Sequence, residues 1–395
     1  MKVLIAEDEG VSRKMLQRTL QKWGYEVVAT EDGKEAFEAF EKDTFQMVIT
    51  DWVMPEMNGL ELVEKIRKSP ENDYVYIIML TAKAQKGDLV VGMEAGADDF
   101  VAKPFDRGEL QVRLRAGERI IRLEKKLSVR NAELERINQR MRVDLEAAAE
   151  IQKSLLPSEI PTIDGVDVAW EYRPCDELAG DILNVFKLDE RHLGFYVLDV
   201  SGHGVPAALL AVTVSRMLSP TTTDQASLLK TRDKTTGKYS LTPPAEVANQ
   251  LNRRFQMTPE NGQFFTMLYG IIDVKTRRLR YATAGHPPII RISKHADQAE
   301  MKVASLPIGF LEDTAYEEQF VQLHPGDRLY LYSDGIPEAE NREQDLYGTE
   351  QMVASLKQNA EGSLRESMQM LLVDVHLWAQ IALKDDATLM GIEIL

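Results

Sequence analysis

The sequence lacks the features that mark a secreted, membrane-spanning or disulfide-stabilised protein. Its 395 residues include one cysteine, Cys175, so neither an internal disulfide nor a cysteine-based metal cluster can form. No run of about 18 apolar residues occurs, which predicts that no helix spans a membrane. The N-terminal segment turns acidic after six residues, unlike a secretory signal peptide. These absences favour a protein of the reducing cytoplasm.

An excess of basic charge is also missing. Lys and Arg number 47 against 63 Asp and Glu, which gives a net charge of −16. Charge-driven binding to nucleic acids or to anionic membranes is therefore disfavoured. The sequence has no terminal basic helix-turn-helix, which argues against a DNA-binding regulator. It also has no G-x-x-x-x-G-K-[ST] loop, which argues against a nucleotide-using enzyme.

The hydrophobic pattern changes twice along the chain and predicts three regions. Residues 1–119 alternate short apolar runs with amphipathic segments, which is typical of an α/β fold whose parallel sheet has helices on both faces. Residues 120–156 read as one long helix. Residues 157–395 are rich in strands with few helices between them, which predicts an α+β domain of layered antiparallel sheets. Within that domain, the polar segment 219–244 is expected to be a loop.

The long helix carries a heptad pattern. Apolar residues recur every seven positions without an intervening proline or glycine, and charged residues occupy much of the rest. This spacing predicts a coiled-coil seam and hence a homodimer. A single helix packed on its own domain is the alternative. The apolar positions are Ile120, Leu127, Leu134, Met141, Ala148 and Leu155, joined at the second seam position by Leu123, Ile137, Leu145 and Ile151.

Carboxylates cluster at strand ends in the N-terminal region. Glu7 and Asp8 follow the first predicted strand, and Asp51 follows the third. Because parallel strands end at the same edge of a sheet, we expect these side chains to converge. Three carboxylates suit Mg²⁺ held together with a phosphoryl oxygen. Thr81 and Lys103 follow further strands, and a hydroxyl and an ammonium group complete the needs of phosphoryl transfer to an aspartate.

The N-terminal region fits one family pattern at Glu7-Asp8, Asp51 with residues 54–59, Thr81-Ala82, residues 96–100 and Lys103-Pro104-Phe105. This pattern resembles the receiver domain of response regulators. The resemblance implies a flavodoxin-like fold with a parallel five-stranded sheet. It implies that Asp51 accepts a phosphoryl group from a sensor histidine kinase or a phosphotransfer protein, with Thr81 and Lys103 as catalytic partners. Thr81 and Phe100 would then rearrange as a switch.

A second set of aspartates lies in the C-terminal region, beside glycine-rich turns or at strand ends. Asp181 follows Ala-Gly, Asp199 opens Asp-Val-Ser-Gly-His-Gly, Asp334 precedes glycine, and Asp385-Asp386 precede Ala-Thr. Oxygen donors without a Cys or His cluster favour Mg²⁺ or Mn²⁺ over Zn²⁺. Two such ions could activate a water for attack on phosphorus. Each aspartate alone is also typical of an ordinary turn, so this alternative stays open.

The C-terminal motifs are residues 150–157, 179–181, 199–204, 265–267, 284–288, 306–309, 332–335 with Glu338, and 385–388. Their order resembles the PPM family of metal-dependent Ser/Thr protein phosphatases, in its bacterial SpoIIE/RsbU-like branch. The resemblance implies a β-sandwich flanked by helices that holds two Mg²⁺ or Mn²⁺ ions. The ligands it implies are Asp181 on one ion, Asp199 and the Val200 carbonyl between the ions, Asp334 and Asp385 on the other, and Asp386 beside them.

Four further residues raise questions about the phosphatase site. The family usually has glycine at the position of Ala179, and a methyl group there would crowd a turn that needs positive φ. His203 is a candidate proton donor for the leaving serine and His286 is a weaker one, although histidines commonly hydrogen-bond a turn instead. Arg173 could bind phosphate or form a surface salt bridge.

The motifs together predict a response regulator phosphatase. We expect phosphorylation of Asp51 to control metal-dependent hydrolysis of phosphoserine or phosphothreonine on a protein. The resemblance implies that this substrate is a phosphorylated anti-sigma-factor antagonist in a partner-switching pathway. The helix should transmit the signal, because its last turns fall within the phosphatase signature. The alternative is a weakly active or inactive phosphatase-like adaptor whose protein binding is switched by the receiver.

Overall fold

The computed structural model describes residues 1–69, 74–82, 86–220, 228–232, 239–258, 262–293, 300–380 and 383–395. The chain forms two compact units, Met1–Arg140 and Met141–Leu395. Helix α5 (Arg107–Lys153) contributes residues to both units. The helix begins within the first predicted region, 1–119. The division into a receiver, a linker at 120–156 and a phosphatase domain at 157–395 stays a prediction.

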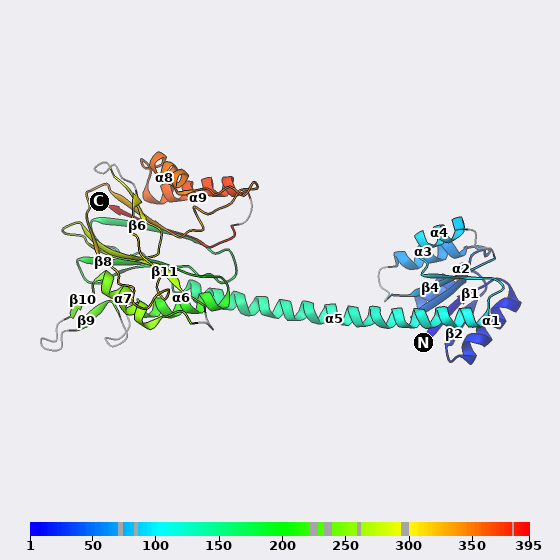
Figure 1. Cartoon of the computed structure of the whole chain (residues 1–395). Coiled ribbons are helices and arrows are strands. Elements are labelled where there is room, and N and C mark those ends of the chain that lie inside the picture. The colour runs from blue at the N-terminus through cyan, green and yellow to red at the C-terminus, as the bar shows by residue number, and fades with distance from the viewer. Residues whose placement is uncertain are drawn as a thin grey trace. The chain divides into compact units, whose positions relative to one another are not determined.

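The first unit is a parallel five-stranded sheet with strand order β2-β1-β3-β4-β5 (Figure 1). Helices α1 and α5 contribute buried leucines to one face, and α2 and α3 cover the other. This confirms the predicted α/β fold. The elements are β1 (Lys2–Ala6), α1 (Gly10–Lys22), β2 (Glu26–Thr30), α2 (Gly33–Lys42), β3 (Met47–Asp51), α3 (Gly59–Lys68), β4 (Tyr76–Thr81), α4 (Lys86–Glu94) and β5 (Asp99–Ala102).

Side-chain caps fix where two of these helices begin. The Asp32 carboxylate accepts hydrogen bonds from the backbone N–H groups of Lys34 and Glu35, each at 2.8 Å, at the start of α2. Asn58 and Glu61 form a reciprocal capping box at the start of α3. Because Asn58 follows the Asp51 strand end closely in sequence, this cap orders the chain beside the candidate phosphoacceptor.

The second unit contains two antiparallel five-stranded sheets, ordered β15-β12-β11-β8-β7 and β14-β13-β16-β17-β6. The strands of these two sheets that precede the C-terminal helices are β6 (Val166–Arg173), β7 (Ile182–Lys187), β8 (His192–Val200), β11 (Phe265–Asp273), β12 (Arg278–Ala284), β13 (Ile289–Ile292), β14 (Glu300–Met301), β15 (Gln319–Gln322) and β16 (Arg328–Tyr332). The chain continues through α8 (Thr349–Gln358) and α9 (Leu364–Ala379) to β17 (Ala387–Ile394).

The two sheets of the second unit form the middle of a four-layer sandwich. Helices α6 (Val205–Met217) and α7 (Pro244–Arg254) pack on the sheet that contains β8 and β11, whereas α8 and α9 pack on the sheet that contains β6 and β17 (Figure 1). The largest apolar core draws residues from both sheets and from α6 and α7. This confirms the predicted β-sandwich flanked by helices.

The segment 219–244 is only partly a loop. Two short strands, β9 (Lys230–Arg232) and β10 (Tyr239–Leu241), pair antiparallel within it. The Thr- and Lys-rich composition gave no sign of this ladder. Residues 221–227 and 233–238 of the predicted loop lie outside the described residues.

Helix α5 carries an exposed apolar stripe in its middle. Leu127 and Leu134 are 55% and 50% exposed, and Leu123, Ile137 and Met141 are also exposed. The ends of the predicted seam differ, because Ile120 packs against the core of the first unit and Leu155 against that of the second. The helix therefore packs on its own domains only near its ends, and the coiled coil stays a prediction for the middle.

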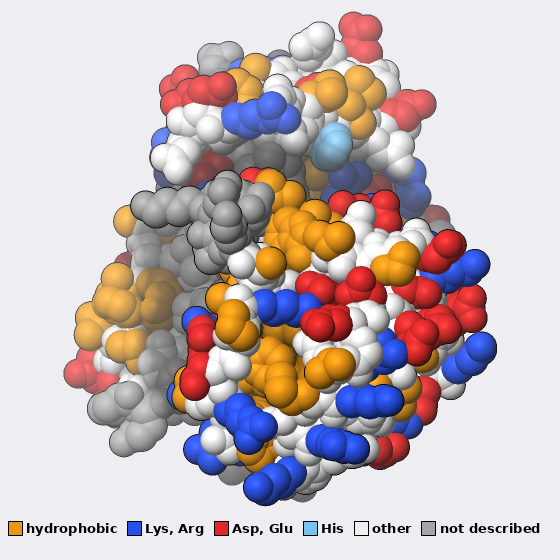
Figure 2. Space-filling model, turned by 90° about the vertical axis from the view of Figure 1, so that its right-hand side faces the viewer, with side chains coloured by type: hydrophobic (Ala, Val, Ile, Leu, Met, Phe, Trp, Pro, Cys, Tyr) orange, Lys and Arg blue, Asp and Glu red, His pale blue; other side chains and the backbone are white. Residues whose placement is uncertain are grey.

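The net acidity of the chain does not produce a uniformly acidic surface. Figure 2 shows Lys and Arg side chains interspersed with Asp and Glu, with hydrophobic groups between them, on the face it presents. Among the described residues, no helix combines the length and the apolar character needed to cross a membrane.

Candidate functional site

The end of β1 and the end of β3 bring three carboxylates together. One oxygen each from Glu7, Asp8 and Asp51 can be chosen so that all lie within 4.8 Å of one another. Glu7 is fully buried, whereas Asp8 is exposed and Asp51 is half-buried. An all-oxygen set that is open on one side fits a hard divalent cation that keeps several waters. The convergence predicted from the strand ends is therefore present.

Lys103 supplies a positive charge to this triad. Its Nζ donates to Asp51 Oδ2 at 2.5 Å and to Glu7 Oε1 at 2.8 Å. Burial raises the pKa of Glu7 even though Lys103 opposes the change. Burial lowers the pKa of Lys103, but its bonds to Asp51 and Glu7 outweigh burial, and the net pKa lies above the ordinary value. The lysine is thus held as a cation beside the candidate phosphoacceptor. The peptide bond to Pro104 is cis.

The two predicted switch residues lie on neighbouring strands. Thr81 ends β4 and is buried, and Phe100 lies in β5 and is half-buried. The Phe100 ring lies 6.3 Å from that of Trp52, which directly follows Asp51. A change at Asp51 therefore has a short packed route to Phe100, while the rearrangement itself stays a prediction.

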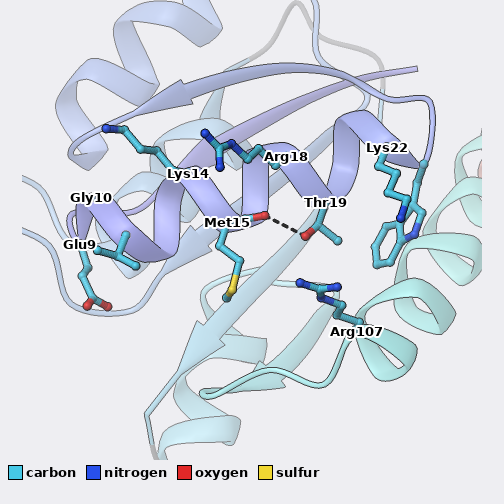
Figure 3. Close-up of a pocket in the computed structure, with 10 residues that line it drawn as sticks. Glu9, Gly10, Lys14, Met15, Arg18, Thr19, Lys22 and Arg107 are labelled. Atoms are coloured by element: carbon cyan, nitrogen blue, oxygen red, sulfur yellow. Dashed lines mark hydrogen bonds between the residues drawn. The ribbon is translucent and has the colours of Figure 1, made fainter.

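A basic surface lies along α1, which begins two residues after Asp8. Figure 3 shows this pocket, with Met15 and Thr19 between cationic side chains from α1 and from the start of α5. The Thr19 hydroxyl donates to the Met15 carbonyl at 2.8 Å, so it does not face the pocket as a free donor. The cationic residues that line the pocket are Lys14, Arg18, Lys22 and Arg107.

The aspartates of the second unit come from four strand ends. Asp181 directly precedes β7, Asp199 lies near the end of β8, Asp334 follows β16, and Asp385 precedes β17. β8 and β7 belong to one sheet, and β16 and β17 to the other, so both sheets contribute to one end of the sandwich. In the described part of the chain, these oxygens are not drawn together within 4.8 Å as the receiver carboxylates are.

Electrostatic coupling shows that these aspartates form one cluster. Burial and the nearby charge of Asp199 raise the pKa of Asp181 well above its ordinary value. Burial, then Asp334 and Asp385, raises the pKa of Asp199 to about 7. Burial, then Asp385 and Glu338, raises the pKa of Asp334 to about 6. Burial and neighbouring charge thus oppose ionisation of Asp181, Asp199 and Asp334, and such a set of carboxylates fits divalent cations of the Mg²⁺ or Mn²⁺ type.

Asp386 holds the Asp181 turn through the backbone. Its Oδ1 accepts from the Cys175 N–H at 2.9 Å, and its Oδ2 accepts from the N–H groups of Gly180 and Asp181 at 2.8 and 3.4 Å. These three bonds occupy both oxygens of the carboxylate. They favour a positioning role for Asp386 over the ligand role that the sequence suggested.

The Thr388 hydroxyl connects Asp181 to the sheet that contains β17, and Ser333 holds Thr388. The Thr388 hydroxyl donates to Asp181 Oδ2 at 2.5 Å, and the Thr388 N–H donates to the Ser333 hydroxyl oxygen at 3.0 Å. The Ser333 hydroxyl in turn donates to the Asp386 carbonyl at 3.0 Å. Thr388, three residues after Asp385, therefore orients Asp181, and Ser333, which precedes Asp334, holds Thr388 in place.

Close backbone approach explains two of the glycines. A Cβ at Gly180 would lie 2.8 Å from the Val200 carbonyl oxygen, and a Cβ at Gly335 would lie 2.2 Å from that of Asp386. Ala179 is buried but is not among the positive-φ positions of the described chain. The methyl group at 179 is thus accommodated, because only the second position of the turn has no room for a side chain.

The last turn of α5 contacts this turn directly. The Gln152 side chain donates through Nε2 to the Ala179 carbonyl at 2.7 Å and accepts through Oε1 from the Ala179 N–H at 3.2 Å. Gln152 is only 5% exposed. The Gln152 amide therefore forms two hydrogen bonds with the backbone of Ala179, which lies one residue before Gly180 and two before Asp181. These bonds fix the turn to the end of α5.

The candidates His286, His203 and Arg173 differ in burial and in their contacts. His286 is buried, its Nδ1 lies 2.7 Å from the Thr266 hydroxyl, and burial lowers its pKa to about 3. It is therefore neutral at pH 7 and cannot serve as a general acid. His203 is largely exposed, with Nδ1 3.5 Å from Asp176. Arg173 is exposed and lines a pocket with Cys175.

Sequence reasoning missed the residues that position the ligands. Gln152 and Thr388 lie inside quoted motifs, yet their types suggested no chemistry of their own. The burial of Gln152 in the last turn of α5 becomes evident only in the structure.

Comparison with known proteins agrees with this geometry. Residues 189–395 match the family model of Stage II sporulation protein E (SpoIIE), and residues 3–115 match that of the response regulator receiver domain. Phosphoserine phosphatase RsbP of Bacillus subtilis is 30% identical over 193 residues, which are 49% of this chain and 45% of RsbP. The chain spans about half the length of curated relatives such as RsbP.

Two further proteins each resemble one part of the chain. Chemotaxis protein CheY1 of Helicobacter pylori is 37% identical over 116 residues, which are 29% of this chain and 94% of CheY1. The SiaA-PP2C domain of Pseudomonas aeruginosa aligns with a TM-score of 0.52 at 21% identity, covering 66% of this chain and 99% of that domain, and shows the fold alone. The SpoIIE match extends over half of the chain, so the protein belongs to the SpoIIE family and carries a response regulator receiver domain ahead of its PPM phosphatase domain.

Proposed function

We propose that this protein is a phosphoserine or phosphothreonine protein phosphatase whose activity is set by phosphorylation of Asp51. The observation that carries the proposal is the coupled cluster of Asp181, Asp199 and Asp334, in which burial and mutual repulsion raise every pKa. Such a cluster is costly for the apo protein and is offset by bound cations. Asp181, Asp199, Asp334 and Asp385 are all present, which favours an enzyme over the inactive adaptor.

The chain's own residues hold and orient the candidate metal ligands. Asp181, Asp199, Asp334 and Asp385 would hold two Mg²⁺ or Mn²⁺ ions, with the Val200 carbonyl as an additional donor. When bound, the ions supply the positive charge that activates water and receives the phosphate oxygens. Thr388 fixes Asp181 Oδ2, and Asp386 and Gln152 hold the backbone of its turn. His203, which is exposed and lies four residues after Asp199 in sequence, stays a candidate proton donor for the leaving hydroxyl.

The receiver would accept its phosphoryl group on Asp51. Glu7, Asp8 and Asp51 would hold one Mg²⁺, and Lys103 is placed to offset charge on the incoming phosphoryl group. The basic surface of α1 begins beside this site and suits an acidic region of the phosphodonor, which we infer to be a sensor histidine kinase or a phosphotransfer protein.

Helix α5 is the proposed transmitter. Two chains would pair along the exposed stripe from Leu123 to Met141 as a coiled coil, giving a homodimer. A change in pairing that moves the last turn would act on Ala179 through Gln152, and so on the Asp181 ligand. The bistable element is the helix pair. From the resemblance of the C-terminal motifs to the SpoIIE/RsbU-like branch, we infer a phosphorylated anti-sigma-factor antagonist as the substrate.

Hydrolysis of p-nitrophenyl phosphate and of a phosphoserine peptide with Mn²⁺ or Mg²⁺ tests the proposal. We expect metal-dependent turnover by the full chain, a loss of at least about a hundredfold in Asp199→Ala, and a change in rate when a small phosphodonor loads Asp51. Asp51→Asn is the matched control, since it should keep basal turnover and lose the response. Metal binding without turnover on either substrate would support the adaptor function instead.

The role of Gln152 has its own test. Gln152→Ala should leave phosphorylation of Asp51 intact while it weakens the effect of the phosphodonor on turnover. Ser154→Ala, two residues further along and exposed, is the control. A full response in Gln152→Ala would contradict transmission through this contact.

A further inference from the structure

An exposed apolar surface lies next to the aspartate cluster. Phe310 and Leu311 are 44% and 54% exposed, Met257 is 42% exposed, and Phe264 is half-buried. The rings of Phe264 and Phe310 meet edge to face with centroids 5.8 Å apart. The Met257 N–H donates to the carbonyl of the residue before Phe310 at 2.9 Å. We call these four residues the Phe310 patch.

Backbone pairing connects the patch to Asp199. The Ser201 N–H donates to the Phe264 carbonyl at 2.9 Å, and the Phe264 N–H donates to the Ser201 hydroxyl at 3.0 Å. These bonds extend the β8–β11 ladder, in which Thr266 pairs with Asp199. Alternate residues of an extended chain share a face, so Phe264 shares the face of Thr266 and Asp199. The patch thus continues the surface that carries the candidate catalytic ligands.

A buried amide fixes the loop that carries the patch. Asn252 is 1% exposed, and its Oδ1 accepts from the Gly309 N–H at 2.8 Å. Its Nδ2 donates to the carbonyls of Leu311 and Glu312 at 2.9 and 3.1 Å. Three bonds from one side chain in α7 hold the backbone on both sides of Phe310. The outward apolar side chains are therefore preorganised, and binding does not have to order the loop.

We propose that the Phe310 patch binds the protein substrate, taking up apolar side chains that flank its phosphorylated serine or threonine. A phosphorylated residue of a protein that reaches Asp199 brings its neighbours across the adjoining surface, and here that surface is apolar and rigid. Rigid aromatic groups at the centre of such contacts provide most of the binding energy. The inference rests on the proposed function, because it names the substrate class of the same site.

The patch would act as a specificity determinant rather than in the chemistry. Phe310 has no ionisable group, and its link to the cluster runs through Phe264 and the Ser201 backbone. Its contribution should therefore depend on the residues around the phosphate and affect KM more than kcat. A second copy of this chain could also cover the patch, and the experiment separates that occupant from a substrate.

The test compares two phosphoserine peptides of equal length, one with Leu and Phe around the phosphoserine and one with Gly and Ser there. We expect the full-length protein with Mn²⁺ to prefer the apolar peptide, and Phe310→Ala to lower that preference about tenfold through KM. Leu311→Ala should act in the same direction and guards against misfolding of the first variant. Leu377→Ala, at an apolar residue on α9 that is 65% exposed, is the control.

Three outcomes would overturn the proposal. One is a wild-type protein without preference between the peptides, and another is an equal loss on both peptides in Phe310→Ala. The third is a change in sedimentation of Phe310→Ala, which would assign the patch to a second copy. Failure of the proposed function is distinct, because wild-type protein would then hydrolyse neither the peptides nor p-nitrophenyl phosphate.

Discussion

The two carboxylate sites of this chain balance their charge differently. In the receiver, Lys103 bonds to both Asp51 and Glu7. In the phosphatase domain, the dominant influences on Asp199 are burial and the other carboxylates, and its pKa rises to about 7. The receiver site thus carries its own counter-charge, whereas the phosphatase cluster depends on charge from outside the chain.

This difference follows from what each site has to do. If Asp51 holds a phosphoryl group covalently, as we propose, a fixed cation beside it stabilises both states of the aspartate. A hydrolytic site instead needs its positive charge to be mobile enough to hold water and phosphate together. Relief of the repulsion between these carboxylates then becomes part of the free energy of metal binding. Removal of one charged side chain should therefore lower stability at the receiver site and raise it at the phosphatase cluster.

Removal of the positive charge of Lys103 should give the largest loss of stability. Lys103→Met leaves the fully buried Glu7 next to Asp51 without a neighbouring cation, and we expect about 2 kcal/mol less protection of β1 and β3 in metal-free protein. Hydrogen exchange of the full chain reports on each unit separately. Added Mg²⁺ should restore part of the loss, and unchanged protection would contradict the counter-charge role of Lys103.

Removal of a carboxylate charge from the phosphatase cluster should instead increase the stability of the metal-free protein. Asp199→Asn relieves repulsion on Asp181 and Asp334, so metal-free protein at pH 8 should gain about 1 kcal/mol in the exchange protection of β8. Asp386→Asn is the matched control, because Asp386 accepts three backbone bonds and its loss should destabilise the turn. A loss of protection in both variants would remove the contrast between the sites.

The pH dependence should be the smallest and most diagnostic effect. The pKa values of Asp199 and Asp334, about 7 and 6, exceed the ordinary value of 3.8. The folded cluster therefore binds more protons than the unfolded chain between about pH 4 and 7, and its stabilising contribution is lost as pH rises through this window. Without metal, protection of β8 should fall from pH 5 to pH 8, and Asp199→Asn should flatten the slope. A flat wild-type profile would refute the coupling.

The residues with their own chemistry were predictable from the sequence. Asp51 and Lys103 converge as strand-end reasoning expects, and Asp181, Asp199 and Asp334 come from strand ends of both sheets. Their position relative to hydrophobic strands carries this information, because parallel or sandwiched strands end at common edges. The α/β fold of the first unit followed from the alternation of short apolar runs with amphipathic segments, and the layered α+β fold of the second followed from its runs of strands.

The parts that depend on long-range partners were not predictable in this way. Asp386 looks like a ligand beside Asp385, and only its bonds to backbone some 200 positions earlier reveal a positioning role. The concern over Ala179 required its actual φ. The heptad pattern also extended to Ile120 and Leu155, whose burial in separate cores cannot be distinguished from a seam by spacing alone. In each case the decisive neighbour is distant in sequence.

The contact between Gln152 and Ala179 consists of two hydrogen bonds between uncharged amides, and it is buried. Neither partner titrates, and no net charge is present for dissolved ions to screen. A signal carried by this contact should therefore keep its amplitude from dilute buffer to high salt. Recognition at the basic α1 surface should, by contrast, weaken as ionic strength rises.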